Sequence, residues 1–253
     1  MSTRKDNDPT VPILRKVAGI VARGLAKTNI TPNQITIGSF IVFVPLIFYF
    51  LIQGTWHGNL IGFALIIVTV IFDMCDGMVA RLKNVSSTFG AWLDTNLDRV
   101  FQYLIFVAVI IGTWQKTGLT QVFIFGLFLL AGQAMADSMG FVYQQKFNFD
   151  IYAGSEIFKD KFKNIKVGIF DRFLKNIIVP YNLFIIFIFA SRYLLTIGLI
   201  TNQAEWFIYI FAITINIRWI FMFLLYVKFL ATGESKLYTV KFLRELSSQN
   251  YAK

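Results

Sequence analysis

Long apolar runs separated by short polar breaks dominate the sequence. The runs lie at roughly residues 34–52, 60–80, 93–113, 119–141, 177–200 and 205–230. Each is close to the ~20 apolar residues that an α-helix needs to cross the hydrocarbon core of a bilayer. Pro32 and Asn33 break the chain before the first run, and Gly54 with residues 57–59 ends it. The pattern therefore predicts six transmembrane helices in a domain over residues 34–230.

The segment from Val11 to Ile30 has a different pattern. Its apolar residues recur at helical spacing, and basic residues occupy much of the remainder: Ile13, Val17, Ile20, Val21 and Leu25 against Arg15, Lys16, Arg23 and Lys27. This is typical of an amphipathic helix that lies in a membrane interface, although a surface helix packed on protein would have the same pattern. We expect residues 1–33 to form a cytoplasmic N-terminus with an interfacial helix, and residues 231–253 to form a basic cytoplasmic tail.

Composition supports an all-α membrane protein rather than a soluble one. The chain is 56% hydrophobic and only 15% charged, whereas a soluble domain is about 25% charged. The single cysteine, Cys75, excludes an intramolecular disulfide. We expect its side chain to face lipid or a neighbouring helix.

The distribution of basic residues predicts the topology. Lys and Arg concentrate in residues 1–33, 146–175 and 236–253, whereas the short loops at 53–59 and 201–204 hold none. By the positive-inside rule, both termini and the connection between the second and third runs lie in the cytoplasm, at the cell membrane if the source is prokaryotic. The net charge of +10 is then expected to meet anionic lipid and not nucleic acid, because no nucleic-acid-binding motif accompanies it.

Four carboxylates lie within the apolar pattern. Asp73 and Asp76 come near the end of the second run, and Asp94 and Asp98 near the start of the third. A carboxylate at membrane depth costs several kcal/mol unless it is paired or solvated, so such residues are functional candidates. Spacings of three and four place each pair on one helical face. Because the connection is short, the two helices should be antiparallel, and the four side chains should converge at their cytoplasmic ends.

Four converging carboxylates repel one another unless cations neutralise them. Oxygen-only ligands suit Mg²⁺ or Mn²⁺, and two such ions can neutralise a diphosphate and polarise the phosphorus under attack. The sequence therefore predicts a site for two divalent ions on Asp73, Asp76, Asp94 and Asp98.

Small residues share the faces of these aspartates. Gly77, Ala80 and Gly90 would let a ligand or a second backbone approach closely. Arg81, at the end of the second run, can bind a phosphate through two N–H groups. Each residue alone has a simpler explanation, either helix packing or charge topology. Together they favour a site for a phosphorylated ligand.

These residues resemble the signature of a known family. The pattern Asp73-x2-Asp76-Gly77-x2-Ala80-Arg81-x8-Gly90-x3-Asp94-x3-Asp98 is similar to that of the CDP-alcohol phosphotransferases, also called CDP-alcohol phosphatidyltransferases. Six helices, an amphipathic N-terminal helix and the Thr31-Pro32-Asn33 segment are similar as well. The resemblance implies transfer of a phosphoalcohol group, such as a phosphatidyl group, from a CDP-linked lipid donor to an acceptor hydroxyl in phospholipid biosynthesis, with release of CMP.

The resemblance also implies roles for single residues. The four aspartates would hold the metal ions, and Asp98 would also be the catalytic base that takes the acceptor's proton. The nucleotide would contact Asp73, Gly77, Ala80, Arg81 and Gly90. Relatives are often homodimers, so we expect a homodimer here.

Three basic residues suggest the acceptor. Lys146, Arg172 and Arg218 would form a second anion site if they pointed into the same cytoplasmic cavity, which favours a polyol phosphate such as inositol phosphate or glycerol phosphate. Arg218 interrupts an apolar run, and an intramembrane arginine usually faces a cavity or a partner. Lys146 and Arg172 also fit charges that set the topology. Serine or diacylglycerol as acceptor stays open, as do an intramembrane prenyltransferase and a cation transporter.

Overall fold

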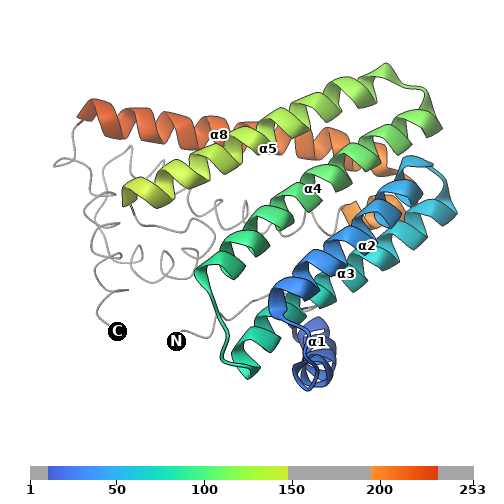
Figure 1. The fold of residues 1–253 in the computed structure, drawn as a ribbon. Helices are drawn as coiled ribbons and strands as arrows, with labels where there is room; N and C mark the ends of the chain where they lie inside the picture. The colour runs from blue at the N-terminus through green and yellow to red at the C-terminus, as the bar shows by residue number, and fades with distance from the viewer. Residues whose placement is uncertain (1–10, 148–194, 233–253) are drawn as a thin grey trace. The chain divides into compact units, whose positions relative to one another are not determined.

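A computed structural model describes residues 11–147 and 195–232 of the chain. Its helices, in order, are α1 (Val11–Ala26), α2 (Pro32–Ile52), α3 (Trp56–Leu82), α4 (Thr88–Thr117), α5 (Thr120–Phe147) and α8 (Ala204–Thr232) (Figure 1). Residues 195–200 are also helical. The described residues contain no strand, so the predicted all-α fold is confirmed for them.

Five helices are long and apolar enough to cross a membrane: α2, α3, α4, residues Thr120–Val142 of α5 and residues Ala204–Leu224 of α8. They correspond to five of the six predicted runs. The remaining run, 177–200, lies outside the described residues except for its last six positions. The structure thus supports an integral membrane protein, and a count of six helices stays a prediction.

The chain divides into two compact units, which are described separately. The first contains Met1–Gly126 and Leu195–Phe207, and the second contains Leu127–Leu194 and Ile208–Lys253. All of the predicted metal and nucleotide residues belong to the first unit.

In the first unit, α2, α3 and α4 each begin at a polar capping residue that precedes the predicted apolar run. Thr31 caps α2: its side chain accepts a hydrogen bond from the backbone N–H of Gln34, while the Gln34 side chain accepts one from the N–H of Thr31. This reciprocal capping box satisfies N–H groups that a helix start leaves without partners. Ser87 caps α4 through a single hydrogen bond, which its side chain accepts from the N–H of Gly90. The α4 helix therefore begins five residues before the predicted apolar run.

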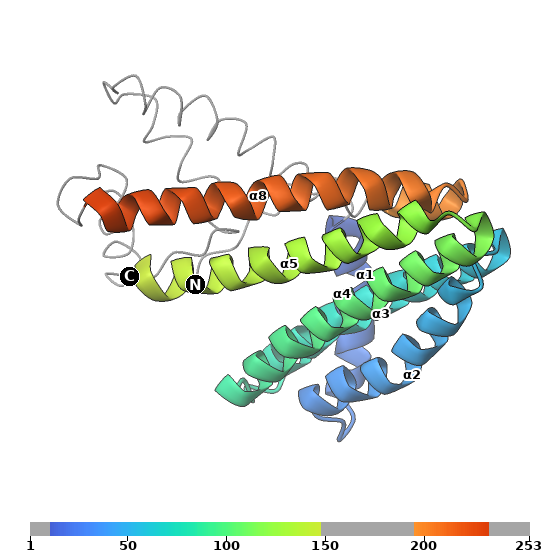
Figure 2. The same cartoon turned by 90° about the horizontal axis from the view of Figure 1, so that it is seen from above.

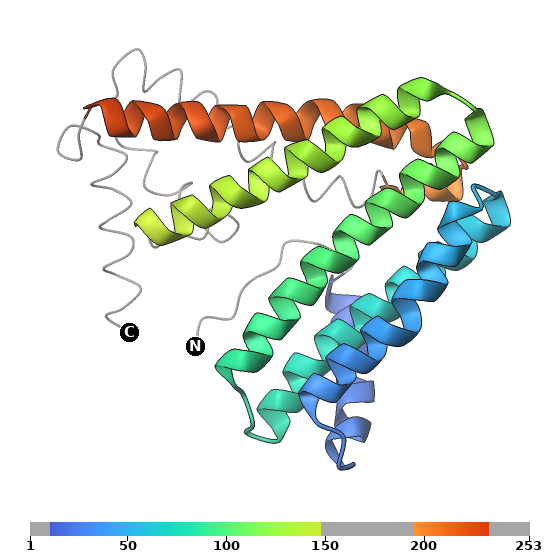
Figure 3. The same cartoon turned by 45° about the horizontal axis from the view of Figure 1, so that its top comes forward.

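In the first unit α2 packs against both α3 and α4, and the three helices run side by side (Figure 3). The backbones of α2 and α4 approach each other closely at Gly112. A side-chain carbon at that position would overlap the carbonyl oxygen of Leu51. Glycine is required here because two backbones approach each other directly.

Helix α1 runs crosswise to these helices and packs on the C-terminal part of α3 (Figure 2). Ala18 and Ala22 are fully buried against Cys75 and Val79. The Cys75 thiol donates a hydrogen bond to the Ala18 carbonyl, 3.2 Å away. Cys75 is therefore helix-facing, one of the two orientations expected for it. The apolar side chains of Ile13, Val17 and Ile20 are exposed on the same helix, and its placement in a membrane interface stays a prediction.

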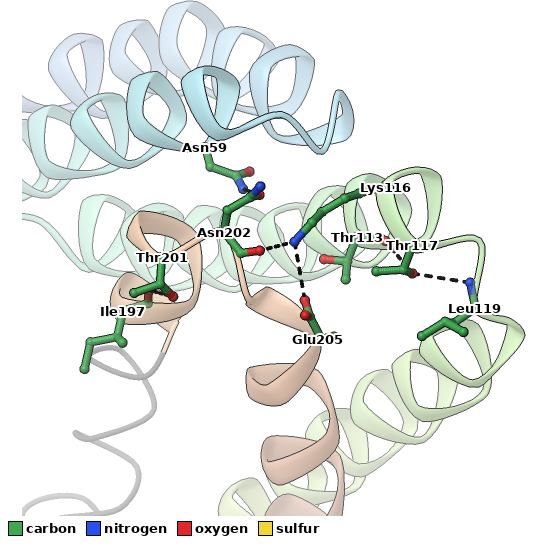
Figure 4. A network of polar contacts seen from close by, with 9 residues as sticks. All are labelled: Asn59, Thr113, Lys116, Thr117, Leu119, Ile197, Thr201, Asn202 and Glu205. Carbon is green, nitrogen blue, oxygen red and sulfur yellow. Dashed lines mark hydrogen bonds and ion pairs between the residues drawn. The ribbon is translucent and has the colours of Figure 1, made fainter.

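A polar network joins residues 195–207 to α3 and α4 (Figure 4). It lies at the opposite end of these two helices from the aspartates. Lys116 donates a hydrogen bond to the backbone carbonyl of Asn202 and lies 3.9 Å from Glu205. Asn59 donates to the Asn202 side chain at 3.1 Å, and the Trp56 indole donates to the Ile200 carbonyl at 2.8 Å. The two loops that were predicted to share one side of the membrane, 53–59 and 201–204, thus meet.

In the second unit α5 packs closely against α8. Asn216 donates a hydrogen bond to the Phe128 carbonyl at 2.8 Å, and a side-chain carbon at Gly132 would collide with the Asn216 amide. Asp137 accepts a hydrogen bond from Gln133, one turn earlier on α5, at 3.0 Å. The side chains of Asn216, Gln133 and Asp137 thus have hydrogen-bond partners within the unit.

Candidate active site

A tight turn of residues 83–87 brings the end of α3 to face the start of α4. Lys83 ends α3, and Asn84 has a positive φ of 56°, a conformation that asparagine tolerates better than most residues. The Val85 N–H then donates to the Ala80 carbonyl at 3.0 Å, and Ser87 starts α4. Because the end of α3 and the start of α4 are both capped, the residues of the turn themselves determine that these two helix ends face each other.

Three of the four predicted carboxylates gather at these facing ends. Oxygen atoms of Asp73, Asp94 and Asp98 all lie within 4.8 Å of one another. Asp73 and Asp94 are half-buried, and Asp98 is exposed. Oδ1 of Asp94 is buried and has no hydrogen-bond partner among the described residues. A buried acceptor with two further carboxylates close by fits a hard divalent cation, which takes oxygen ligands and cancels their repulsion.

Asp76 lies outside this group of three. It is 6% exposed, and its Oδ2 accepts a hydrogen bond of 2.5 Å from the hydroxyl of Thr36 on α2. The fourth carboxylate is therefore held by a helix that the sequence pattern did not connect with the site. Asp76 and Thr36 are 40 residues apart, so no local periodicity links them.

The predicted nucleotide residues border the carboxylates. The Arg81 guanidinium lies over Gly77: a side-chain carbon at residue 77 would be 3.6 Å from Nη1 of Arg81. At Gly90, a side-chain carbon would be 3.0 Å from Oδ1 of Asn33. Gly90 thus lets the start of α2 approach α4 closely. Ala80 is half-buried on α3.

Lys83 connects the chain before α2 to the end of α3. Its ammonium donates hydrogen bonds to the carbonyls of Thr28 and Ile30, at 2.6 and 2.8 Å. Neither Lys83 nor Thr36 was singled out from the sequence. A lysine at the end of a long apolar helix resembles a charge that sets the topology, and a pattern of side chains does not reveal backbone carbonyls as its partners.

The predicted acceptor residues are only partly described. Arg218 is buried in α8, at 4% exposure, and belongs to the second unit. Lys146 lies in the last turn of α5, and the description does not extend to its side chain; Arg172 lies outside the described residues. Their predicted convergence stays a prediction.

Comparison with known proteins identifies the motif and the fold. A family model for CDP-alcohol phosphatidyltransferase matches residues 29–223, most of the chain. An archaetidylinositol phosphate synthase of Pyrococcus horikoshii is 29% identical over 36% of this chain and 47% of its own length. A phosphatidylinositol phosphate synthase of Corynebacterium glutamicum is 34% identical over 35% of this chain and 39% of its own length. The matched stretch thus spans less than half of these relatives.

A solved structure has a similar fold. The crystal structure of Mycobacterium tuberculosis phosphatidylinositol phosphate synthase with CDP-DAG bound superposes with a TM-score of 0.54 at 17% identity, covering 82% of this chain and 92% of that one. The residues of this chain that match the family model include the whole aspartate motif and the start of α2. The chain therefore belongs to the CDP-alcohol phosphatidyltransferase family.

Proposed function

We propose that this protein is an enzyme that transfers a phosphatidyl group from CDP-diacylglycerol to an acceptor hydroxyl, with release of CMP. The acceptor oxygen attacks the phosphorus that carries the lipid, and the phosphoanhydride bond to CMP breaks. The acceptor's proton passes to a base. The observation that carries the proposal is that carboxylate oxygens of Asp73, Asp94 and Asp98 lie within 4.8 Å of one another. These residues also lie within the region that matches the family model.

The aspartates are proposed to hold two Mg²⁺ or Mn²⁺ ions. Members of the family use divalent metal ions, and the carboxylate group has the ligand chemistry that such ions prefer. When bound, the ions neutralise the diphosphate of the donor and make its phosphorus more electrophilic. Asp73, Asp94 and Asp98 would supply ligands from the group of three, and Asp76 would supply the fourth side chain.

The neighbouring residues are proposed to bind the nucleotide and move the proton. Arg81 would bind a donor phosphate through two N–H groups, and Gly77, Ala80 and Gly90 would leave space for CDP beside Asp73. Asp98 is proposed as the base because it is the exposed member of the group of three. An exposed carboxylate next to the reacting phosphorus can meet an acceptor that arrives from water.

The acceptor is proposed to be a polyol phosphate, inositol phosphate or glycerol phosphate. Two relatives are named as synthases of inositol phosphate lipids. Arg218, buried in an apolar helix, is the type of residue that binds an anion at membrane depth. Together with Lys146 and Arg172 it would bind the acceptor's phosphate. Serine and diacylglycerol, which carry no phosphate, would not need such a site.

We further propose that both termini and the site face the cytoplasm, that α1 lies at the membrane interface, and that the enzyme is a homodimer. Labelling of single introduced cysteines with a membrane-impermeant maleimide tests the topology. Asn84→Cys in the α3–α4 turn and His57→Cys at the start of α3 should react from opposite sides. Reaction of both from the same side would contradict the proposed topology.

The activity is tested with the purified full chain, Mn²⁺ and CDP-diacylglycerol. Inositol phosphate, glycerol phosphate, serine and diacylglycerol are offered separately, and CMP is measured. We expect CMP release that requires the metal and is fastest with a polyol phosphate. Fastest release with serine or diacylglycerol would overturn the acceptor assignment, and no CMP release from CDP-diacylglycerol with any of the four acceptors would overturn the proposed function.

A further inference from the structure

Thr36 on α2 donates a hydrogen bond to the carboxylate of Asp76. Thr36 itself is not part of the aspartate motif. We infer that Thr36 is a positioning residue for Asp76: its hydroxyl binds Oδ2 and thereby leaves Oδ1 as the oxygen that Asp76 offers to a divalent cation. This inference rests on the proposed function, because it assigns Thr36 a role at the proposed metal site.

The direction of the hydrogen bond follows from the groups present. The Thr36 oxygen lies 2.5 Å from Oδ2 of Asp76 and 3.1 Å from the Pro32 carbonyl. A hydroxyl has one proton, and an ionised carboxylate has none. Both neighbours can only accept, and a hydrogen bond to an ionised carboxylate is charge-assisted and stronger than one to a carbonyl. The hydroxyl therefore donates to Asp76.

Thr36 differs in this respect from other threonines of the chain. Thr69 and Thr214 each donate to the carbonyl four residues earlier, at 2.9 and 2.8 Å. That arrangement is common for a helical threonine and needs no function. Thr36 instead reaches a buried aspartate on another helix, one turn from Asp73, a member of the group of three.

The backbone around Thr36 is fixed from several directions, so its hydroxyl is held in place. The capping box at Thr31 begins α2, and the two hydrogen bonds from Lys83 fix the chain just before it. The adjacent Ile35 is buried in one cluster with Ala18, Ala22, Cys75 and Val79. A positioning group must be locked by its own packing if it is to fix the orientation of a ligand.

The test compares Mn²⁺ binding by three variants of the full chain in detergent. Thr36→Val removes the hydroxyl and retains the shape, and Thr36→Ser retains the hydroxyl. Thr214→Val makes the same change at a half-buried threonine that donates to carbonyls of its own helix. Free Mn²⁺ is measured by electron paramagnetic resonance, and thermal unfolding is measured in EDTA. If Thr36→Val does not fold, Thr36→Ala replaces it.

Loss of a partner that orients a metal ligand typically weakens metal binding ~10–100-fold. We expect that loss for Thr36→Val, and binding within about threefold of wild type for Thr36→Ser and Thr214→Val. The Mn²⁺ concentration that gives half-maximal CMP release should rise by the same factor in Thr36→Val. A lower unfolding temperature in EDTA with unchanged Mn²⁺ binding would overturn the inference, as would equal loss in the serine variant.

The outcomes separate this inference from the proposed function. If wild-type protein binds Mn²⁺ and releases CMP while Thr36→Val binds Mn²⁺ equally well, only the role of Thr36 is wrong. If wild-type protein neither binds Mn²⁺ nor releases CMP, both are wrong.

Discussion

The side-chain amide of Asn59 donates a hydrogen bond to the side chain of Asn202, 3.1 Å away and 143 residues further along the chain. Lys116 donates to the backbone carbonyl of the same Asn202 and pairs with Glu205 (Figure 4). These contacts fix residues 195–207 to α3 and α4 at the end remote from the aspartates. They are structural contacts, and their loss should affect stability separately from catalysis.

Lys116→Met should therefore destabilise the protein without changing its catalytic rate. It removes a charged hydrogen bond and an ion pair between partly buried groups, so we expect a loss of about 1–2 kcal/mol. For a chain of this size that lowers Tm by about 2–4 °C per kcal/mol. Thermal unfolding in detergent measures the effect, with the exposed Lys27→Met as control. A fall in CMP release per folded molecule would contradict the separation of the two ends.

Asp94→Asn should reduce the stabilisation of the protein by metal. Without metal, the variant relieves repulsion with Asp73 and Asp98, whose oxygens lie within 4.8 Å, so its Tm in EDTA should exceed that of wild type. Wild type should gain about 2.7 kcal/mol at a Mn²⁺ concentration 100 times its Kd. The variant should gain much less. Equal stabilisation of both proteins by Mn²⁺ would remove Asp94 from the site.

Asp98→Asn should abolish turnover while much of the nucleotide binding remains. An amide cannot accept the acceptor's proton, and loss of a general base typically costs ~10²–10⁴-fold in rate. Single-turnover CMP release and CDP binding are measured in parallel. The control is Asp137→Asn, whose carboxylate accepts a hydrogen bond from Gln133 on the same helix. Retained turnover in Asp98→Asn would remove this residue as base.

Gly112→Val should be strongly destabilising. A side chain at this position would overlap the Leu51 carbonyl, and forcing helices apart typically costs about 1–3 kcal/mol or more. The matched control is Gly38→Ala on α2, where a side-chain carbon meets no atom within 4 Å. That change should be neutral or stabilising by up to about 1 kcal/mol, because glycine is a poor helix former. Similar unfolding temperatures for the two variants would contradict the close contact of α2 and α4.

Apolar periodicity predicted where the long helices lie in the chain better than where they begin and end. The run at 93–113 corresponds to α4, yet α4 extends from Thr88 to Thr117. The Ser87 cap just before α4 and Gly90 in its first turn carry no hydropathy signal. For α3 the predicted 60–80 became Trp56–Leu82, again because a threonine cap precedes the apolar part.

The candidate site was predictable to the extent that it is local in sequence. The spacing of three placed Asp73 and Asp76 on one face of α3, and the spacing of four placed Asp94 and Asp98 on one face of α4. The short connection predicted that these two faces lie opposite each other. Thr36 and Lys83 escaped prediction because they act across helices, through a hydroxyl and through backbone carbonyls. Which of the four carboxylates would meet also depends on side-chain rotamers, which spacing does not determine.

The capped turn between α3 and α4 constrains the rotational phase of α4 about its own axis. An α-helix advances about 100° per residue, so one residue inserted between Gly90 and Asp94 would swing the Asp94–Asp98 edge a quarter-turn or more away from Asp73. The eight-residue spacer between Arg81 and Gly90 comprises the end of one helix, the turn and the cap of the next. The number of residues from the Ser87 cap to Asp94 therefore helps to determine whether the two helices present their acids to the same ion.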